Sequence, residues 1–175
     1  MTTSETDTST EVLLAMYRTE LAMLDAQTGD TAGARDALAE IVGRIPDLMR
    51  AEEFYAVVLQ TRGETAAAIG EWRARAEAAP ASAAERIVLA NLLWRAGRVD
   101  EAAEQLRRAV AIKEDSALAH LLLARYYRDF RPAAAPAPGA SAAHFQRALE
   151  TALTPFDEDA VRRARGDVAP GALAG

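Results

Sequence analysis

The sequence repeats itself with a period of 34 residues, and this period constrains the fold more than any other feature of the chain. Glycine stands at positions 29, 63 and 97, and proline stands at positions 46 and 80. Alanines and large residues share the same register: Ala22, Ala56, Ala90 and Ala124; Leu21, Tyr55, Leu89 and Leu123; Ala34, Ala68 and Ala102; Leu38, Trp72 and Leu106. A fixed period of this length is typical of solenoids, in which one small unit stacks on copies of itself.

Each unit has the pattern of two helices joined by a tight turn. In the third unit, Leu89 and Leu93 are four residues apart and share one face of a helix. Gly97 then ends that helix, because glycine adopts the left-handed conformation of a C-terminal cap at little cost. Ala102 and Leu106 mark one face of a second helix, where the alanine allows a close approach and the leucine fills the space beside it. The pattern predicts a helical hairpin in every unit.

Composition agrees with helices. Half of the residues are apolar, many of them alanine, which is the best helix former, and aromatic residues make up only 6%. The β-branched and aromatic runs that mark strands are scarce. The period divides residues 10–154 into four units, at about 15–48, 49–82, 83–116 and 117–154.

The fourth unit is longer than the others. Phe145 and Ala148 resemble Leu106 and Ala109 of the third unit, but they follow at an interval five residues longer than the period. The excess falls in residues 131–140, where three prolines and a glycine disfavour a helix. We therefore expect an exposed loop there, with a proline-rich ligand for a groove-binding domain as the alternative.

Outside the array, we expect one helix and two tails. Residues 155–166 begin with an acidic run and end with arginines, which is the charge order that a helix dipole favours. A polar helix that covers the last repeat is typical of solenoids, so this segment is predicted to be a capping helix. Residues 1–9 and 167–175 are predicted to be disordered.

This arrangement resembles the tetratricopeptide repeat, a 34-residue helix–turn–helix with a turn glycine, an alanine before a bulky residue in the second helix, and a closing proline. The resemblance covers three full units and an irregular fourth. It implies an all-α solenoid of about four helix pairs with a C-terminal capping helix. The sequence departs from the family where a large aromatic is expected early in each first helix, since these positions hold Arg18, Glu52, Arg86 and His120.

The sequence offers little for catalysis, metal binding or nucleic-acid binding. It has no cysteine, and its two histidines, His120 and His144, lie in different predicted helices without a carboxylate at ligand spacing. The net charge is −6 and Lys113 is the single lysine, so a concentrated basic surface for phosphates is not expected. We expect no cofactor, no metal, no nucleic-acid partner and no enzyme activity.

Nothing in the sequence predicts a membrane protein. No run of about 18 apolar residues is present, and the first ten residues lack the basic start of a secretion signal. The expectation is therefore a cytoplasmic protein without a membrane partner.

The family resemblance implies a concave surface, formed by the first helix of each unit, that binds a segment of another protein. The expected binding residues are Met23, Phe54, Val57, Ile87, Val88, Asn91, Trp94, Leu121, Leu122 and Arg125. Most are apolar, which favours an amphipathic helix or an extended apolar peptide as the ligand. Alternatively, this stripe packs against a neighbouring helix or the chain's own C-terminal helix. Only Asn91 and Arg125 fit a set that grips a terminal carboxylate, so that interpretation is less favoured.

The predicted function is therefore a non-catalytic adaptor, assembly factor or co-chaperone-like module that binds another protein. The alternative is a scaffold that self-associates into a homo-oligomer, in which the apolar face or an open end of the array meets another copy. An enzyme is the more distant alternative.

Overall fold

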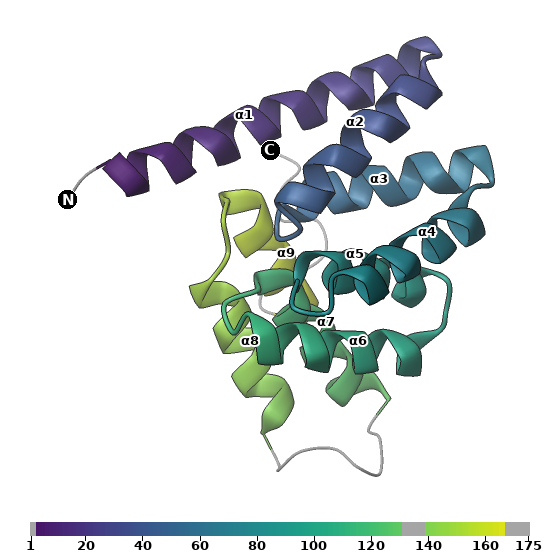
Figure 1. The fold of residues 1–175 in the computed structure, drawn as a ribbon. Coiled ribbons are helices and arrows are strands. Elements are labelled where there is room, and N and C mark those ends of the chain that lie inside the picture. Colours follow the sequence, from purple (N-terminus) through teal and green to yellow (C-terminus); the bar gives the residue numbers. More distant parts are fainter. Residues whose placement is uncertain (1–2, 131–138, 167–175) are drawn as a thin grey trace.

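The computed structural model describes residues 3–130 and 139–166, and all regular structure in these residues is helical (Figure 1). The helices are α1 (Thr3–Thr28), α2 (Thr31–Arg44), α3 (Met49–Arg62), α4 (Thr65–Ala78), α5 (Ala84–Arg95), α6 (Val99–Ile112), α7 (Ala117–Asp129), α8 (Ala140–Glu150) and α9 (Pro155–Arg165). The first eight form four successive hairpins, and α9 follows the last of them. The predicted all-α solenoid of about four helix pairs with a C-terminal helix is confirmed.

The ends of the chain are described only in part. Helix α1 begins at Thr3, so most of the segment 1–9 is helical rather than a disordered tail. The physical reason is that no glycine or proline interrupts the chain before Gly29. Residues 131–138 of the expected loop and the whole expected tail 167–175 lie outside the described residues.

The turns within the hairpins are closed by glycines in the left-handed conformation. Gly63 has φ +69° and Gly97 has φ +77°, which costs a residue without a side chain little. In both turns, the residue after the glycine donates its backbone N–H to a carbonyl of the last helical turn, Glu64 to Leu59 and Arg98 to Leu93, at 2.9 Å. The same cap therefore recurs after one repeat period.

The core is built from alanines that allow close packing and large residues that fill the space between helices. Trp72 of α4 and Tyr55 of α3 are both fully buried and meet edge to face, with ring centroids 6.5 Å apart. The indole N–H of Trp72 donates a hydrogen bond to the Tyr55 hydroxyl at 3.1 Å, so neither polar atom is left unpaired. This pair anchors the second hairpin.

Helix α9 turns back onto the array instead of covering only its last hairpin. It contacts α3 and α7 as well as α8. The buried carboxylate of Asp157 accepts a hydrogen bond from the backbone N–H of Met49 at 3.0 Å, and its second oxygen accepts one from the Thr154 hydroxyl at 2.8 Å. Asp157 thereby satisfies an N–H at the start of α3 that has no partner within that helix. This contact fixes α9 across the first helices of the hairpins.

A second buried aspartate ties the α2–α3 turn to the start of α7. Asp47 accepts hydrogen bonds from the Ser116 hydroxyl at 2.6 Å and from the backbone N–H of Leu118 at 3.2 Å. Its other oxygen accepts one from the Lys113 ammonium group at 3.0 Å. Together, Asp47 and Asp157 join the second hairpin to the C-terminal part of the chain through satisfied charges.

The two histidines, which the sequence places in different helices, meet between α7 and α8. Nδ1 of His120 and Nδ1 of His144 lie 2.7 Å apart, and Nε2 of His120 lies 2.8 Å from the carbonyl oxygen of Glu114. The carbonyl can only accept, so Nε2 of His120 carries the proton and His144 donates to Nδ1 of His120. Burial, and then the neighbouring His120, lower the pKa of His144 to about 4. The pair thus links α7 to α8 within the last hairpin.

Candidate partner-binding groove

A groove of about 500 Å³ runs between the first helices of the last three hairpins and α9. Its walls come from α3, α5, α7 and α9. The residues that line it are Met49, Glu52, Glu53, Asn91, Trp94, Arg95, Leu118, Leu121, Leu122, Arg125, Phe156, Ala160, Arg163 and Ala164. A concave site of this volume with mixed apolar and polar walls is typical of ligand sites in proteins.

Three arginines line this groove without a carboxylate partner. Arg95 of α5, Arg125 of α7 and Arg163 of α9 form no ion pair with any described residue, although many other arginines of the chain do. Arg125 lies over the ring of Trp94 with 5.3 Å between guanidinium carbon and ring centroid, and Arg163 lies 5.9 Å from the ring of Phe156. The aromatic rings hold the guanidinium groups in place and leave their N–H donors unneutralised.

Electrostatics make Arg125 a favourable place for an anion. Burial lowers the pKa of this arginine; Asp129 opposes this effect, whereas the positive charges of Arg128 and Arg95 add to it. An arginine remains charged in proteins despite such effects, so the partial burial of the Arg125 charge is unfavourable in free energy. A bound carboxylate would relieve that cost.

Glu52 does not supply the missing negative charge. Its side chain is fully buried, and one oxygen accepts a hydrogen bond from the Asn91 amide at 2.8 Å while the other has no partner. Burial raises the pKa of Glu52 to about 8, although Asn91 and then Arg95 lower it, so the neutral acid predominates at neutral pH. Glu53, which is exposed, carries the other carboxylate among the described residues that line the groove.

The structure brings together five of the predicted binding residues. Asn91, Trp94, Leu121, Leu122 and Arg125 all line the groove, with Leu121 and Leu122 as part of its apolar floor. These five residues lie close together because the repeat places the first helices of successive hairpins side by side.

The other five predicted residues lie elsewhere. Ile87 and Val88 are completely buried, so a ligand could reach them only by displacing packed neighbours. Met23 and Phe54 are half-buried against other helices, and Val57 is exposed on α3 outside the groove.

Sequence reasoning gave the C-terminal helix only as an alternative partner of the apolar stripe and did not name residues of α9 in the site. Phe156 and Arg163 line the groove because α9 folds back, and the repeat register cannot place a helix that lies outside the repeat. The signal that could have indicated it is the amphipathic pattern of α9, in which Phe156, Ala160 and Val161 recur at helical spacing.

Residues 83–126 match the sequence profile of the tetratricopeptide repeat family. The matched region contains α5, α6, the turn at Gly97 and most of α7, and of these elements α5 and α7 supply residues of the groove. The match agrees, over these residues, with the resemblance to the tetratricopeptide repeat that the sequence indicates. No curated protein matches the chain in sequence at a significant level.

Among solved structures, the chain is similar to several structures of MamA. A MamA structure from Desulfovibrio magneticus RS-1 is 18% identical, and the alignment covers 78% of this chain and 75% of that one with a TM-score of 0.48. A MamA double mutant is 17% identical, with 88% and 78% of the two chains covered and a TM-score of 0.48.

Two further features are absent from the described residues, a metal cluster and a membrane-spanning helix. These residues contain no group of three or more histidine, aspartate or glutamate side chains that could hold a metal ion. No helix in the same part of the chain has the length and apolar character needed to cross a membrane.

Proposed function

We propose that this protein is a protein-interaction module that works as an adaptor or assembly factor by holding an acidic segment of a partner protein in the groove. The observation that carries the proposal is the set of three groove arginines, Arg95, Arg125 and Arg163, none of which forms an ion pair with a described carboxylate. Arg125 is half-buried, whereas Arg95 and Arg163 are exposed. A positive charge that is partly removed from water normally pairs with an anion, so an anionic ligand is favoured at Arg125, with the other two arginines beside it. The tetratricopeptide repeat at 83–126 supports a protein as that ligand.

The lining of the groove defines the chemistry of the segment. Guanidinium groups match carboxylates with two parallel hydrogen bonds, and a side-chain or a C-terminal carboxylate could be held in this way. Trp94 and the leucines of the floor, Leu121 and Leu122, would cover an apolar side chain next to the carboxylates. The proposed ligand is therefore a short segment in which acidic and apolar residues are neighbours.

A nucleic acid carries phosphates that would also attract arginines, but the rest of the molecule disfavours it. The chain has a net charge of −6, and Glu53 stands in the groove itself. A long polyanion is repelled by such a surface, whereas a short acidic segment needs only local complementarity.

The proposal is tested with labelled peptides in which glutamate or aspartate alternates with leucine or phenylalanine. Fluorescence anisotropy measures their affinity, and peptides with glutamine and asparagine in place of the acids should bind at least about tenfold more weakly, about 1.4 kcal/mol. Peptides that end in a carboxylate or in an amide distinguish a terminal from a side-chain anion.

Variants of the protein then locate the binding. The double variant Arg95→Ala with Arg163→Ala should bind the acidic peptides at least about tenfold more weakly. The matched control is Arg108→Ala, which removes an exposed arginine of α6 outside the groove and should leave affinity unchanged. The proposal would be contradicted if the peptides with glutamine and asparagine bound as tightly as the acidic peptides. It would also be contradicted if Arg108→Ala reduced the affinity as much as the double variant does.

A further inference from the structure

The outward face of α1 displays a row of large apolar side chains. Leu14, Tyr17, Leu21 and Leu24 keep 58%, 63%, 59% and 54% of their surface exposed. The neighbouring Leu13 is 49% exposed. The other exposed large apolar residues of the described chain are scattered over α3, the end of α6, the end of α7 and the turn before α9. A contiguous apolar surface of this kind marks a site of interaction.

The spacing of this row suits a second helix. Leu14, Tyr17, Leu21 and Leu24 follow one another at intervals of three, four and three residues, which is the seam of a helix that packs along another helix. We call these four residues the α1 stripe. Helix α1 has 26 residues and is the first helix of the array (Figure 1). Among the described residues no earlier hairpin packs against α1, so its outward face, which carries the stripe, is at an open end of the array.

We infer that the α1 stripe is the contact surface for a second copy of this chain, with the two α1 helices antiparallel. The order of the intervals is the same in both directions, so an antiparallel copy places Leu14 opposite Leu24 of the other copy and Tyr17 opposite Leu21. A two-fold symmetric contact requires this self-complementarity, because each residue must meet its counterpart in both copies. The inference is independent of the proposed groove function.

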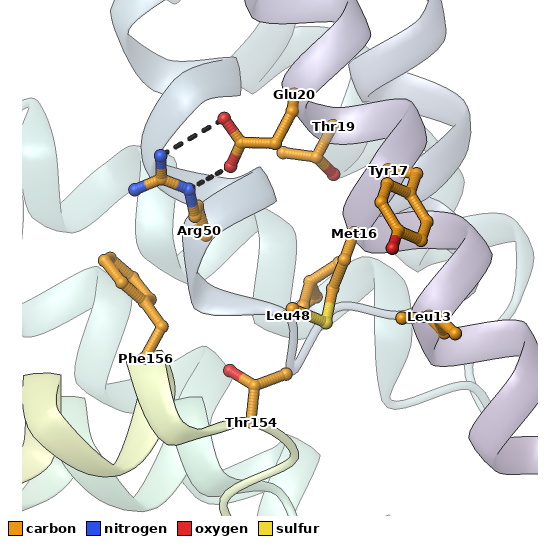
Figure 2. A pocket seen from close by; sticks show the side chains of 9 residues that line it. All are labelled: Leu13, Met16, Tyr17, Thr19, Glu20, Leu48, Arg50, Thr154 and Phe156. Carbon is orange, nitrogen blue, oxygen red and sulfur yellow. Dashed lines mark hydrogen bonds and ion pairs between the residues drawn. The ribbon is translucent and has the colours of Figure 1, made fainter.

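Three ion pairs neutralise charges beside the stripe within one copy, whereas the exposed Asp25 forms no ion pair with a described residue. Arg44 pairs with Glu11 and Arg18 pairs with Glu40, both at 2.9 Å, on the side of α2. On the other side, Glu20 pairs with Arg50 of α3 (Figure 2). In the antiparallel pairing, Asp25 lies opposite Leu13 of the other copy and roughly 18 Å along the helix from the second Asp25. Two copies can therefore approach along this face without placing unpaired like charges directly against each other, despite a net charge of −6 on each chain.

The available apolar area agrees with a dimer of modest size. The five exposed side chains of α1 offer roughly 500 Å², which is the size of the largest patch on a typical monomer. A standard interface buries about 800 Å² on each partner, and the adjoining surface supplies part of the difference. Figure 2 shows this surface, where Leu13, Met16 and Tyr17 border a pocket of about 190 Å³ with Leu48 and Phe156.

The chain's own C-terminal segment is a poorer occupant. Residues 167–175 contain only two large apolar side chains, Val168 and Leu173, against five exposed on α1. Two side chains cannot cover a stripe that extends over three turns of helix.

The first test is the mass of the protein in solution. Sedimentation equilibrium should give the mass of two chains at micromolar concentration, and Leu21→Glu should raise the dissociation constant at least about 100-fold, because it places an unpaired carboxylate in the seam. The matched control Ile112→Glu changes an exposed apolar residue of α6 and should leave the mass unchanged. Wild-type protein with the mass of one chain up to about 100 µM would overturn the inference, as would a dimer that Leu21→Glu does not weaken.

A second test reads the direction of packing. The chain has no cysteine, so single substitutions Leu14→Cys and Leu24→Cys give unique thiols. When a tagged Leu14→Cys protein is mixed with an untagged Leu24→Cys protein under mild oxidation, the mixed disulfide should form, whereas each variant alone should stay uncrosslinked, since like positions lie about 15 Å apart in an antiparallel pair. Crosslinking of Leu14→Cys with itself would indicate a parallel arrangement and contradict the inference.

Discussion

Trp72 is the residue on which the second hairpin depends most. Its ring is buried and its indole N–H is paired with Tyr55. An added Cβ at Gly43 would come within 3.2 Å of that ring, so α2 packs closely against it. We expect Trp72→Ala to reduce the free energy of unfolding by about 3–5 kcal/mol, because the cavity cannot close around it. Urea melts measure this quantity, and a loss below about 1 kcal/mol would contradict the packing described.

Glu52 makes stability depend on pH. Its pKa is 4.5 in an exposed setting and is raised to about 8 in the folded protein, chiefly by burial. Between these values the folded protein keeps a proton that the unfolded chain has released. Because of Glu52, the free energy of unfolding therefore falls as the pH rises from about 4.5 to 8. Above about pH 8 this decrease is complete.

Replacement of Glu52 by glutamine tests this dependence. Glu52→Gln removes the ionisable group and keeps an oxygen that can accept the hydrogen bond of Asn91. The variant should be more stable than the wild type at about pH 9, by on the order of a few kcal/mol, and should differ little from it at about pH 4.5. Urea melts at both pH values check this expectation. A stability difference that is the same at both would show that Glu52 titrates normally.

Among the helices, α9 is held in place by a contact between two residues that are far apart in the sequence. Asp157 on α9 is buried and accepts the N–H of Met49 at the start of α3. The variant Asp157→Ala leaves that N–H without a partner and should cost about 1–3 kcal/mol. Trypsin should then cleave faster after Arg162 and Arg163.

The control for this prediction is Asp159→Ala, which removes the same charge two residues further along α9. It should leave both the rate of cleavage and the free energy of unfolding near the wild-type values. If Asp157→Ala and Asp159→Ala behaved alike, the Asp157 contact would not be what holds α9.

Helix α5 shows where sequence reasoning about a face reaches its limit. Every residue from Ile87 to Leu93 is buried, because α5 is surrounded by neighbours from earlier and later hairpins and from its own. A helix that is apolar all round has no face that periodicity can identify. The register could therefore place Asn91 and Trp94 near the groove but could not tell that Ile87 and Val88 are core residues.

For the whole molecule, the 34-residue period was sufficient to predict the four hairpins and the turn glycines, because each hairpin repeats one local pattern. The return of α9 was not predictable in this way. Its contact joins residues 108 positions apart, and the segment belongs to no repeat. Of the three groove arginines, only Arg125 is among the predicted binding residues. Arg95 also lies in the repeat register, whereas Arg163 enters the groove only through the tertiary fold.

The central claim is that an acidic segment binds at the three groove arginines. It is tested most directly by NMR of the arginine Nε–H signals while the acidic peptide is added. The account predicts that the signals of Arg95, Arg125 and Arg163 shift progressively with peptide concentration, because their N–H groups have no carboxylate partner among the described residues. The signals of Arg73 and Arg108, outside the groove, should stay in place. Shifts confined to those outer arginines, or no shifts at a saturating concentration of peptide, would contradict it.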